Sequence, residues 1–486
     1  MTTESEAVGF GLVYWNGDFN MKSGAKLTEG KIVKSLINLA LPIMGTSFIQ
    51  MAYNMTDMIW IGRLGSSSVA AVGTAGFFTW LAMAFILIPK IGAEIGVSQS
   101  IGSNDKEQAR CYARCSIQIA AVLALFYSIF LIVFRKNLIG FFGLGEEAVV
   151  DWAMGYLSII SLGMVFYFLN PVFTGIFNGY GDSRAPFWVN AAGLLTNIVL
   201  DPLLIFGLGP FPEMGVNGTA IATVISQVVA FTLFIYMIKI KTDLLVTMNI
   251  FRTPKIYRVK RIFTLGMPIA LENGLFTIFT MIVARVVAQW GSAAIAVQKV
   301  GAQVEAISWM TSVGFSTALG AFTGQNYGAG KAHRITRGFF ASMGMVSAVG
   351  AAATFAFVFW AEPIFKIFIN EKEALLYGAD YLRILGYSQI LMCIEITASG
   401  AFNGIGKTLP PSIVGIVFTG MRVPFAMWAA SKGFGLNAIW WIFSMTSIIK
   451  GIILFVWFIP QIKRGYGLGE SEKGDLMEEA KKGIII

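Results

Sequence analysis

The sequence predicts an all-α polytopic membrane protein, with twelve transmembrane helices in two pseudo-symmetric six-helix bundles. Composition, the length of the apolar runs and an internal repeat predict this class. Of the 486 residues, 56% are hydrophobic and only 13% are charged, whereas soluble domains carry about 25% charged residues. The apolar runs are about 20 residues or longer and do not alternate with polar residues, so they fit helices that cross lipid better than the strands of a membrane barrel.

Twelve apolar spans follow one another along the chain. They are expected at 36–60, 68–98, 113–134, 148–174, 186–207, 217–238, 263–288, 293–322, 338–360, 375–400, 411–430 and 436–460. The predicted organisation is an N-terminal extension (1–34), an amino-terminal lobe (35–238), a basic linker (239–262), a carboxy-terminal lobe (263–460) and a charged tail (461–486). The extension is polar and has no apolar core of a secretory signal.

Lysine and arginine lie mostly in the loops on one side of the predicted membrane. The linker is the most basic loop, and its cations are Lys239, Lys241, Arg252, Lys255, Arg258, Lys260 and Arg261. The other side has only Arg63, Arg135, Lys136, Lys366, Lys372 and Lys432. Because basic loops stay inside, the extension, linker, tail and both termini are expected in the cytoplasm, and the protein in the cytoplasmic (inner) membrane. The same rule explains the net charge of +9 without a nucleic-acid partner.

The two halves of the chain contain a repeat. Pro42 matches Pro268 at an offset of 226, and the same offset pairs Gly102 with Gly328. It also pairs Gln99 with Gln325, and the motif FNGYG (177–181) returns as FNGIG (402–406). Each half has an even number of spans, so both halves have the same orientation in the membrane. Parallel repeats of this kind occur in secondary transporters.

Ionisable residues inside the spans are the first functional candidates, because a charge at the centre of a span costs about 2.5–3.5 kcal/mol. Asn197 and Asp201 lie one turn apart and share a helix face, and Pro202 frees the carbonyl of Ile198. With Asp57 of the first span, these oxygens suit a proton or Na⁺, since two buried carboxylates resist being charged together. The alternative is that Asp201 and Pro202 form a structural kink.

Motifs in both halves resemble the MATE (multidrug and toxic compound extrusion) family, prokaryotic and DinF-like or NorM-like, over residues 33–462. They are YNMTDMIWIGRLG (53–65), the two FNGxG turns and NIVLDPLLIFGLG (197–209). The resemblance implies two lobes around a V-shaped cleft, and export of organic cations driven by influx of H⁺ or Na⁺. It also implies a cation-coupling site, for H⁺ or Na⁺, at Asp57, Asn197, Asp201 and Thr219, and a second cation or substrate site at Glu272 and Glu395.

The carboxy-terminal half lacks a counterpart of the central carboxylate. Its equivalent of Asp201-Pro202 is Val423-Pro424, so the bend recurs and the charge does not. Coupling is therefore expected in the amino-terminal lobe. The alternative for Glu272 and Glu395 is a structural ion pair or hydrogen bond with Arg285, Lys299 or Gln303. Four cations, Arg285, Arg383, Arg422 and Lys450, are interpreted as lying near span ends and snorkelling to the interface.

No enzyme motif is present: the sequence has no Walker loop, nucleotide fingerprint, HExxH or nucleophile elbow. We therefore expect a secondary antiporter that works by alternating access, with no cofactor besides an H⁺ or Na⁺ gradient and no bound metal other than Na⁺. Its expected partners are small amphiphilic or cationic drug-like substrates and the lipid bilayer, with the chain as a monomer. Tyr53 and Met281 are nominated for the substrate cleft.

Two other transport classes stay open. A flippase for lipid-linked oligosaccharides or lipids, from the same superfamily, would need several arginines converging on the cleft. Arg285, Arg383 and Arg422 are the candidates for that role. A channel is the other alternative, and the two-lobe repeat with isolated acids favours gating around one site over an open pore.

Overall fold

The computed structural model describes residues 26–144, 146–241, 250, 252–368 and 371–467, and every regular element in these ranges is helical. The helices are α1 (Ile32–Gly62), α2 (Ser66–Gly102), α3 (Lys106–Gly140), α4 (Glu147–Tyr180), α5 (Arg184–Ile205), α6 (Gly215–Lys241), α8 (Ile256–Val287), α9 (Ser292–Gly328), α10 (Ala332–Phe359), α11 (Ala361–Lys366), α12 (Lys372–Gly386), α13 (Gln389–Gly404), α14 (Leu409–Ser431) and α15 (Leu436–Lys463), with short 3₁₀ turns at Ala288–Trp290 and Gly465–Gly467. The predicted fold class is confirmed.

Each predicted span coincides with a long helix or a helix pair. Within the described ranges, ten helices are long and apolar enough to cross a membrane, and a bent pair adds an eleventh. The remaining predicted span corresponds to α9, which is 37 residues long and is not among these ten helices. Most of the predicted extension (1–34) and tail (461–486), and much of the linker, lie outside the described residues, so the proposed domain boundaries stay a prediction.

One predicted span, 375–400, is broken. α12 and α13 meet at a bend of 54°, and no proline explains it. Side chains take the backbone carbonyls that the break releases: Ser444 Oγ donates to Ile384 O at 2.9 Å, and Thr354 Oγ1 donates to Gly386 O at 2.7 Å. The polar partners come from α15 and α10, so the bend is a product of tertiary packing.

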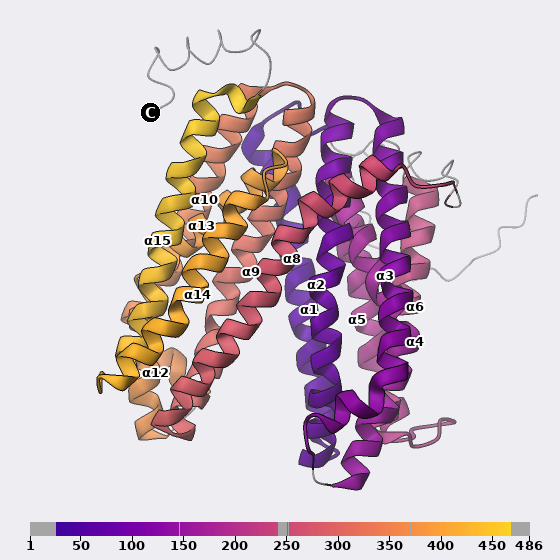
Figure 1. Cartoon of the computed structure of the whole chain (residues 1–486), viewed down its shortest axis with the longest axis vertical. Helices are drawn as coiled ribbons and strands as arrows, with labels where there is room; N and C mark the ends of the chain where they lie inside the picture. The colour runs from indigo at the N-terminus through magenta and orange to yellow at the C-terminus, as the bar shows by residue number, and fades with distance from the viewer. Residues whose placement is uncertain (1–25, 145, 242–249, 251, 369–370, 468–486) are drawn as a thin grey trace, which may run out of the picture.

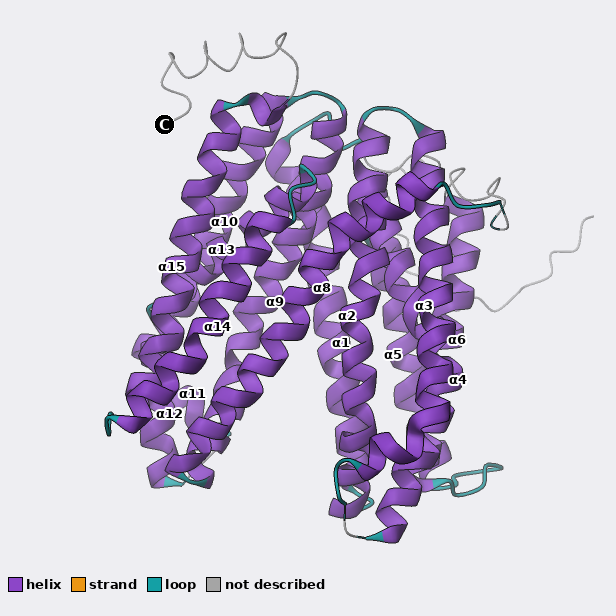
Figure 2. Cartoon of the chain, viewed as in Figure 1, coloured by secondary structure: helices purple, strands orange, loops and turns teal. Residues whose placement is uncertain are grey.

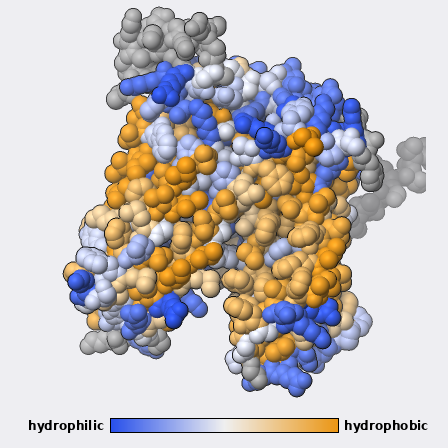
Figure 3. Space-filling view, in the orientation of Figure 1, coloured by the Kyte–Doolittle hydropathy of each residue, from blue (hydrophilic) through white to orange (hydrophobic). Residues whose placement is uncertain are grey.

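The helices form two bundles, α1–α6 and α8–α15, that meet at one end and diverge at the other (Figures 1 and 2). We name these the closed end and the open end. Figure 3 shows the surface hollowed between the bundles at the open end, and a broad hydrophobic band across the visible face of both bundles. Exposed side chains such as Phe126 (72%) and Leu162 (70%) belong to this apolar exterior, which fits a surface that faces lipid.

Two helices cross from one bundle to the other near the closed end. The first turns of α1 place Leu36 and Leu39 in the core of the carboxy-terminal bundle, together with Phe458. In α8, Ile262 belongs to the core of the amino-terminal bundle, and Gly266 contacts the backbone of Ile88. The repeated prolines Pro42 and Pro268 lie within α1 and α8. Each bundle therefore borrows the start of a helix from the other half.

Glycines and glutamines of the repeat meet at the closed end. Gly102 contacts the backbone of Gln325, and Gly328 contacts the backbone of Gln99, so a side chain at either glycine would overlap the facing chain. Gln99 Nε2 donates to Gly404 O at 2.8 Å, and Gln325 Nε2 donates to Gly179 O at 3.0 Å. Both acceptors are in the FNGxG turns. The sequence repeat is thus a structural repeat that joins the two bundles.

The residues before α1 attach to the carboxy-terminal bundle. Leu27 is buried, and its backbone N–H donates to Gln325 Oε1 at 3.1 Å. The guanidinium of Arg334 donates to the carbonyls of Leu27, Glu29 and Gly30 at 3.0–3.1 Å. This segment, 27–30, therefore crosses the closed end as a strap.

Candidate functional site

Three of the predicted site residues are fully buried where α5 meets α6. Asn197 and Asp201 lie one turn apart on α5, Thr219 is on α6, and each of them is 0% exposed. Asn197 Nδ2 donates to Asp201 Oδ1 at 3.3 Å. The two helices come close because Gly218, next to Thr219, has no side chain and contacts the backbone of Leu204. The packing therefore places Thr219 at the helix contact that holds Asp201.

The first helix completes the cluster. Asp57 on α1 is half-buried, and its carboxyl group lies beside the carboxyl group of Asp201 and the side-chain amide of Asn197. Tyr53, one turn earlier, is 9% exposed and lies near Thr223 of α6 and both aspartates. The structure therefore brings together Asp57, Asn197, Asp201 and Tyr53.

Several oxygens in this cluster are buried without a hydrogen-bond partner. They are Tyr53 Oη, Asp57 Oδ1, Asn197 Oδ1, Asp201 Oδ2, Thr219 Oγ1 and Thr223 Oγ1. An unsatisfied buried polar group costs about 1–3 kcal/mol, and native proteins keep few of them. A set of hard oxygen donors with two carboxylates fits a proton or a small hard cation such as Na⁺. The donor set of the described residues is therefore suited to cation binding.

Two members of the cluster are absent from the sequence prediction. Thr223 is one turn after Thr219, so the four-residue spacing on α6 could have found it. Tyr156 of α4 is buried beside Asp57 and Asp201, and it is one tyrosine among 14 in the chain with no distinguishing pattern.

Glu395, an acid of the carboxy-terminal bundle, has a protein partner. Lys450 Nζ lies 2.7 Å from Glu395 Oε1, and the two side chains are 9% and 12% exposed. The alternative interpretation of Glu395 as a paired acid named the wrong partners, Arg285, Lys299 or Gln303, and the snorkelling interpretation of Lys450 is wrong. This lysine is near the middle of α15 and points into the bundle. Glu272 of α8 contacts Gly415 and lies near Ser412 and Glu395.

Arg422 also points into the bundle, which contradicts its snorkelling assignment. Its guanidinium donates to Thr446 Oγ1 at 2.8 Å and to Ser447 Oγ at 2.9 Å. Glu305, which the sequence did not single out as a site, accepts from Tyr381 Oη at 3.1 Å and from Gln389 Nε2 at 3.1 Å. The buried charged groups of Glu395, Lys450, Arg422 and Glu305 are therefore each ion-paired or hydrogen-bonded.

Met281, the other residue nominated for the substrate cleft, lies apart from the amino-terminal cluster. Met281 is 56% exposed and lies on α8, in a different bundle from Tyr53.

Lys90 and Glu94 line a small cavity of about 60 Å³ between α2, α9 and α13. Among the described residues no ion pair joins these two, although both face the cavity with Ser98 and Asn403.

Known proteins agree with this architecture. A family model described as MatE matches residues 42–203 and 268–428. A probable multidrug resistance protein NorM of Thermotoga maritima is 30% identical over 391 residues, which are 79% of this chain and 82% of that protein.

Solved structures of MATE transporters have the same fold as this chain. A crystal structure of MATE in the straight conformation has a TM-score of 0.84 at 25% identity, and covers 92% of this chain and 100% of that one. An outward-facing conformation of a multidrug resistance MATE family transporter of the MOP superfamily has a TM-score of 0.83 at 25% identity, over 92% and 99%. The family match, the relatives and the two-bundle fold together show that this chain belongs to the MATE family of multidrug efflux transporters.

Proposed function

We propose that this chain is a secondary antiporter that exports organic cations and drugs in exchange for H⁺ or Na⁺ by alternating access. The observation that carries the proposal is the amino-terminal cluster, where six oxygen atoms, one from each of two carboxyl groups and four others, are buried without a hydrogen-bond partner. Asp57, Asn197 and Asp201 would hold the ion, with Thr219 at the edge of the set. Of the two acids of the expected second cation or substrate site, Glu272 is kept, and Glu395 is left out because Lys450 pairs with it.

The chemistry of the cluster explains how an ion could drive transport. Two neighbouring carboxylates away from water are unfavourable when both are charged, so taking up one cation relieves the repulsion. A cationic substrate and the coupling ion would then compete for the same negative charge. Asp57 lies on α1, the helix that begins in the opposite bundle. A change of charge at Asp57 therefore acts on an element that joins both bundles.

The two bundles have a preferred orientation in the membrane under this proposal. The basic loops lie at the closed end, which the positive-inside rule assigns to the cytoplasm, together with both termini. The hollow at the open end then faces the other side of the cytoplasmic membrane, so the structure is in an outward-open state. We expect the working unit to be a monomer with its substrate cleft between the bundles, where Tyr53 and Met281 are the nominated contacts.

The arrangement of arginines supports the antiporter over a flippase. Arg285 is exposed on α8, Arg383 lies 3.8 Å from Asp380, and Arg422 is bound inside the bundle. These three residues do not converge on one place. Among the described residues, these three arginines therefore offer an anionic headgroup no cluster between the lobes.

The test is efflux of ethidium from proteoliposomes under separately imposed pH and Na⁺ gradients. We expect one gradient to drive efflux, and Asp201→Asn and Asp57→Asn to abolish that response with the protein still folded. Asp151→Asn, at an exposed acid of α4, is the control and should behave as the wild type. Gradient-driven efflux at wild-type rates in both site variants would refute the assignment of the coupling site. If neither gradient drives efflux by the wild type, the proposal of an antiporter is refuted.

A further inference from the structure

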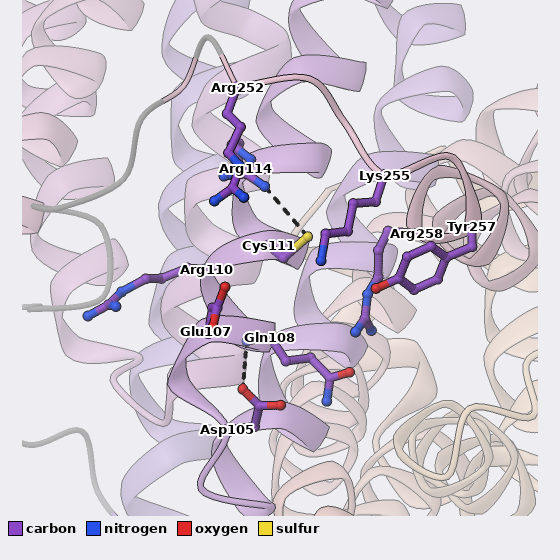
Figure 4. Close-up of a pocket in the computed structure, with 10 residues that line it drawn as sticks. All are labelled: Asp105, Glu107, Gln108, Arg110, Cys111, Arg114, Arg252, Lys255, Tyr257 and Arg258. Carbon is purple, nitrogen blue, oxygen red and sulfur yellow. Dashed lines mark hydrogen bonds between the residues drawn. The ribbon is translucent and has the colours of Figure 1, made fainter.

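A basic pocket lies at the closed end, away from the cation cluster. It has a volume of about 440 Å³, and its lining includes Arg114, Arg252, Lys255 and Arg258. Figure 4 shows these residues around one space, with Arg110 extending away from the others. The pocket forms between the first turns of α3 and the segment that leads into α8. It therefore joins the amino-terminal bundle to the helix that crosses into the other half.

Hydrogen bonds fix the two sides of the pocket. Gln118 Nε2 of α3 donates to Ile250 O at 2.6 Å and to Arg252 O at 2.9 Å, which holds the end of the linker against α3. The guanidinium of Arg258 lies 4.6 Å from the ring of Tyr112 and 4.9 Å from the ring of Tyr257. The ring contacts orient the guanidinium of Arg258 without neutralising its charge.

Arg114 is the observation that points to a ligand. This residue is only 7% exposed, and its nearest polar contact is a weak one from Nη2 to Cys111 Sγ at 3.7 Å. Its Nε atom is buried with no hydrogen-bond partner, and so is Nε of Arg258. A buried charge normally requires pairing and hydrogen bonds. Among the described residues, no carboxylate lies within ion-pair distance of Arg114.

The acids of the pocket do not balance its cations. Asp105 and Glu107 are the acidic lining residues, and Asp105 Oδ1 already accepts from Gln108 N at 2.8 Å as the cap of α3. Four cations face the space even when Arg110 is left out. The field inside the pocket is therefore positive, and it favours an anion with several oxygen acceptors.

We propose that this pocket binds a phosphate group. Guanidinium groups present a fork of N–H donors that matches phosphate oxygens, and Lys255 adds a mobile point charge. Basic pockets between helices on the cytoplasmic side of a membrane bind anionic lipid headgroups, and soluble phosphates carry the same oxygens. The ligand would clamp the linker segment to α3. This inference does not depend on the proposed transport cycle.

The test uses the full-length chain purified in detergent, with thermal unfolding followed by a maleimide dye. All three cysteines, Cys111, Cys115 and Cys393, are buried, so the dye reports unfolding. The probes are inorganic phosphate against chloride at equal ionic strength, and short-chain phosphatidylglycerol against phosphatidylcholine. We expect a higher unfolding midpoint with a phosphate-bearing anion and no change with its control. A response to phosphatidylglycerol alone identifies the source as a membrane headgroup, and a response to both or to phosphate alone identifies the bare group.

Variants separate a built pocket from general attraction to positive charge. Arg252→Gln/Lys255→Gln removes two exposed cations from the pocket and should weaken binding at least tenfold. The matched control, Arg184→Gln/Lys463→Gln, removes two exposed cations elsewhere and should leave the affinity unchanged. Arg114→Lys keeps the charge but loses the fork, and should weaken binding as well. Equal affinity in the pocket and control variants would overturn the proposal, and so would a wild type that responds to no probe.

Discussion

The ion pair between Glu395 and Lys450 offers a thermodynamic test of the polar interior. Its atoms are 2.7 Å apart, and its side chains are 12% and 9% exposed, respectively. Lys450→Met keeps the length of the apolar stem and deletes the charge, which leaves Glu395 buried beside Glu272. Removing one partner of a buried pair costs about 3–5 kcal/mol, or about two to four powers of ten in the folding equilibrium.

The double variant Lys450→Met/Glu395→Leu removes the pair together. Replacing a buried ion pair by apolar side chains of similar volume is often neutral or stabilising by about 1–4 kcal/mol. We therefore expect the double variant to be at least as stable as the wild type and far more stable than either single variant. Free energies of unfolding come from SDS titration in mixed micelles, followed by the fluorescence of the 12 tryptophans.

The result also separates the roles of the two bundles. Because coupling is proposed for the amino-terminal cluster, the double variant should keep gradient-driven efflux. A loss below about 1 kcal/mol in Lys450→Met, or a double variant as unstable as the single one, would refute the assignment of a desolvated ion pair.

Three further predictions concern glycines and amides. Gly328→Leu should hold the closed end apart because Gly328 contacts the backbone of Gln99, whereas its control, Gly344→Leu, has open space around it. With Ser98→Cys added to each variant, an impermeant maleimide should label the new cysteine faster in Gly328→Leu than in Gly344→Leu. Gln325→Ala removes the acceptor of the Leu27 amide and the donor to Gly179, so hydrogen exchange of the strap should accelerate, while Gln303→Ala at an exposed position leaves it unchanged. Gly218→Val should push α6 away from Leu204 and impair coupled efflux, and Gly274→Val, in open space, should not; unimpaired efflux in Gly218→Val would contradict the tight contact beside Thr219.

The spans could be predicted from sequence because lipid imposes a minimum apolar length on each of them. α5 is observed at Arg184–Ile205 against a predicted 186–207, and α14 at Leu409–Ser431 against 411–430. The bend between α12 and α13 could not be predicted in this way. Its hydrogen-bond donors, Thr354 and Ser444, are remote in sequence, so only the packed bundle reveals them.

The candidate site divides in the same manner. Asp57, Asn197 and Asp201 were identifiable because ionisable and amide groups inside a span are costly, and the structure places them together. Tyr156 gave no such signal because a tyrosine in an apolar span fits packing or lipid contact equally well. The position of Lys450 along its span did not reveal its partner, since Glu395 comes from a different helix.

The glycine contacts at the closed end have an energetic consequence. Backbones touch there without interlocking side chains, and the two glutamine amides supply one symmetric hydrogen bond each. At about 1 kcal/mol net per bond, these two links are worth about 2 kcal/mol. A membrane potential of about 100 mV supplies roughly 2.3 kcal/mol for each elementary charge that crosses it. Under the proposed antiport, the free energy of one inward cation is therefore about equal to that of this pair of bonds.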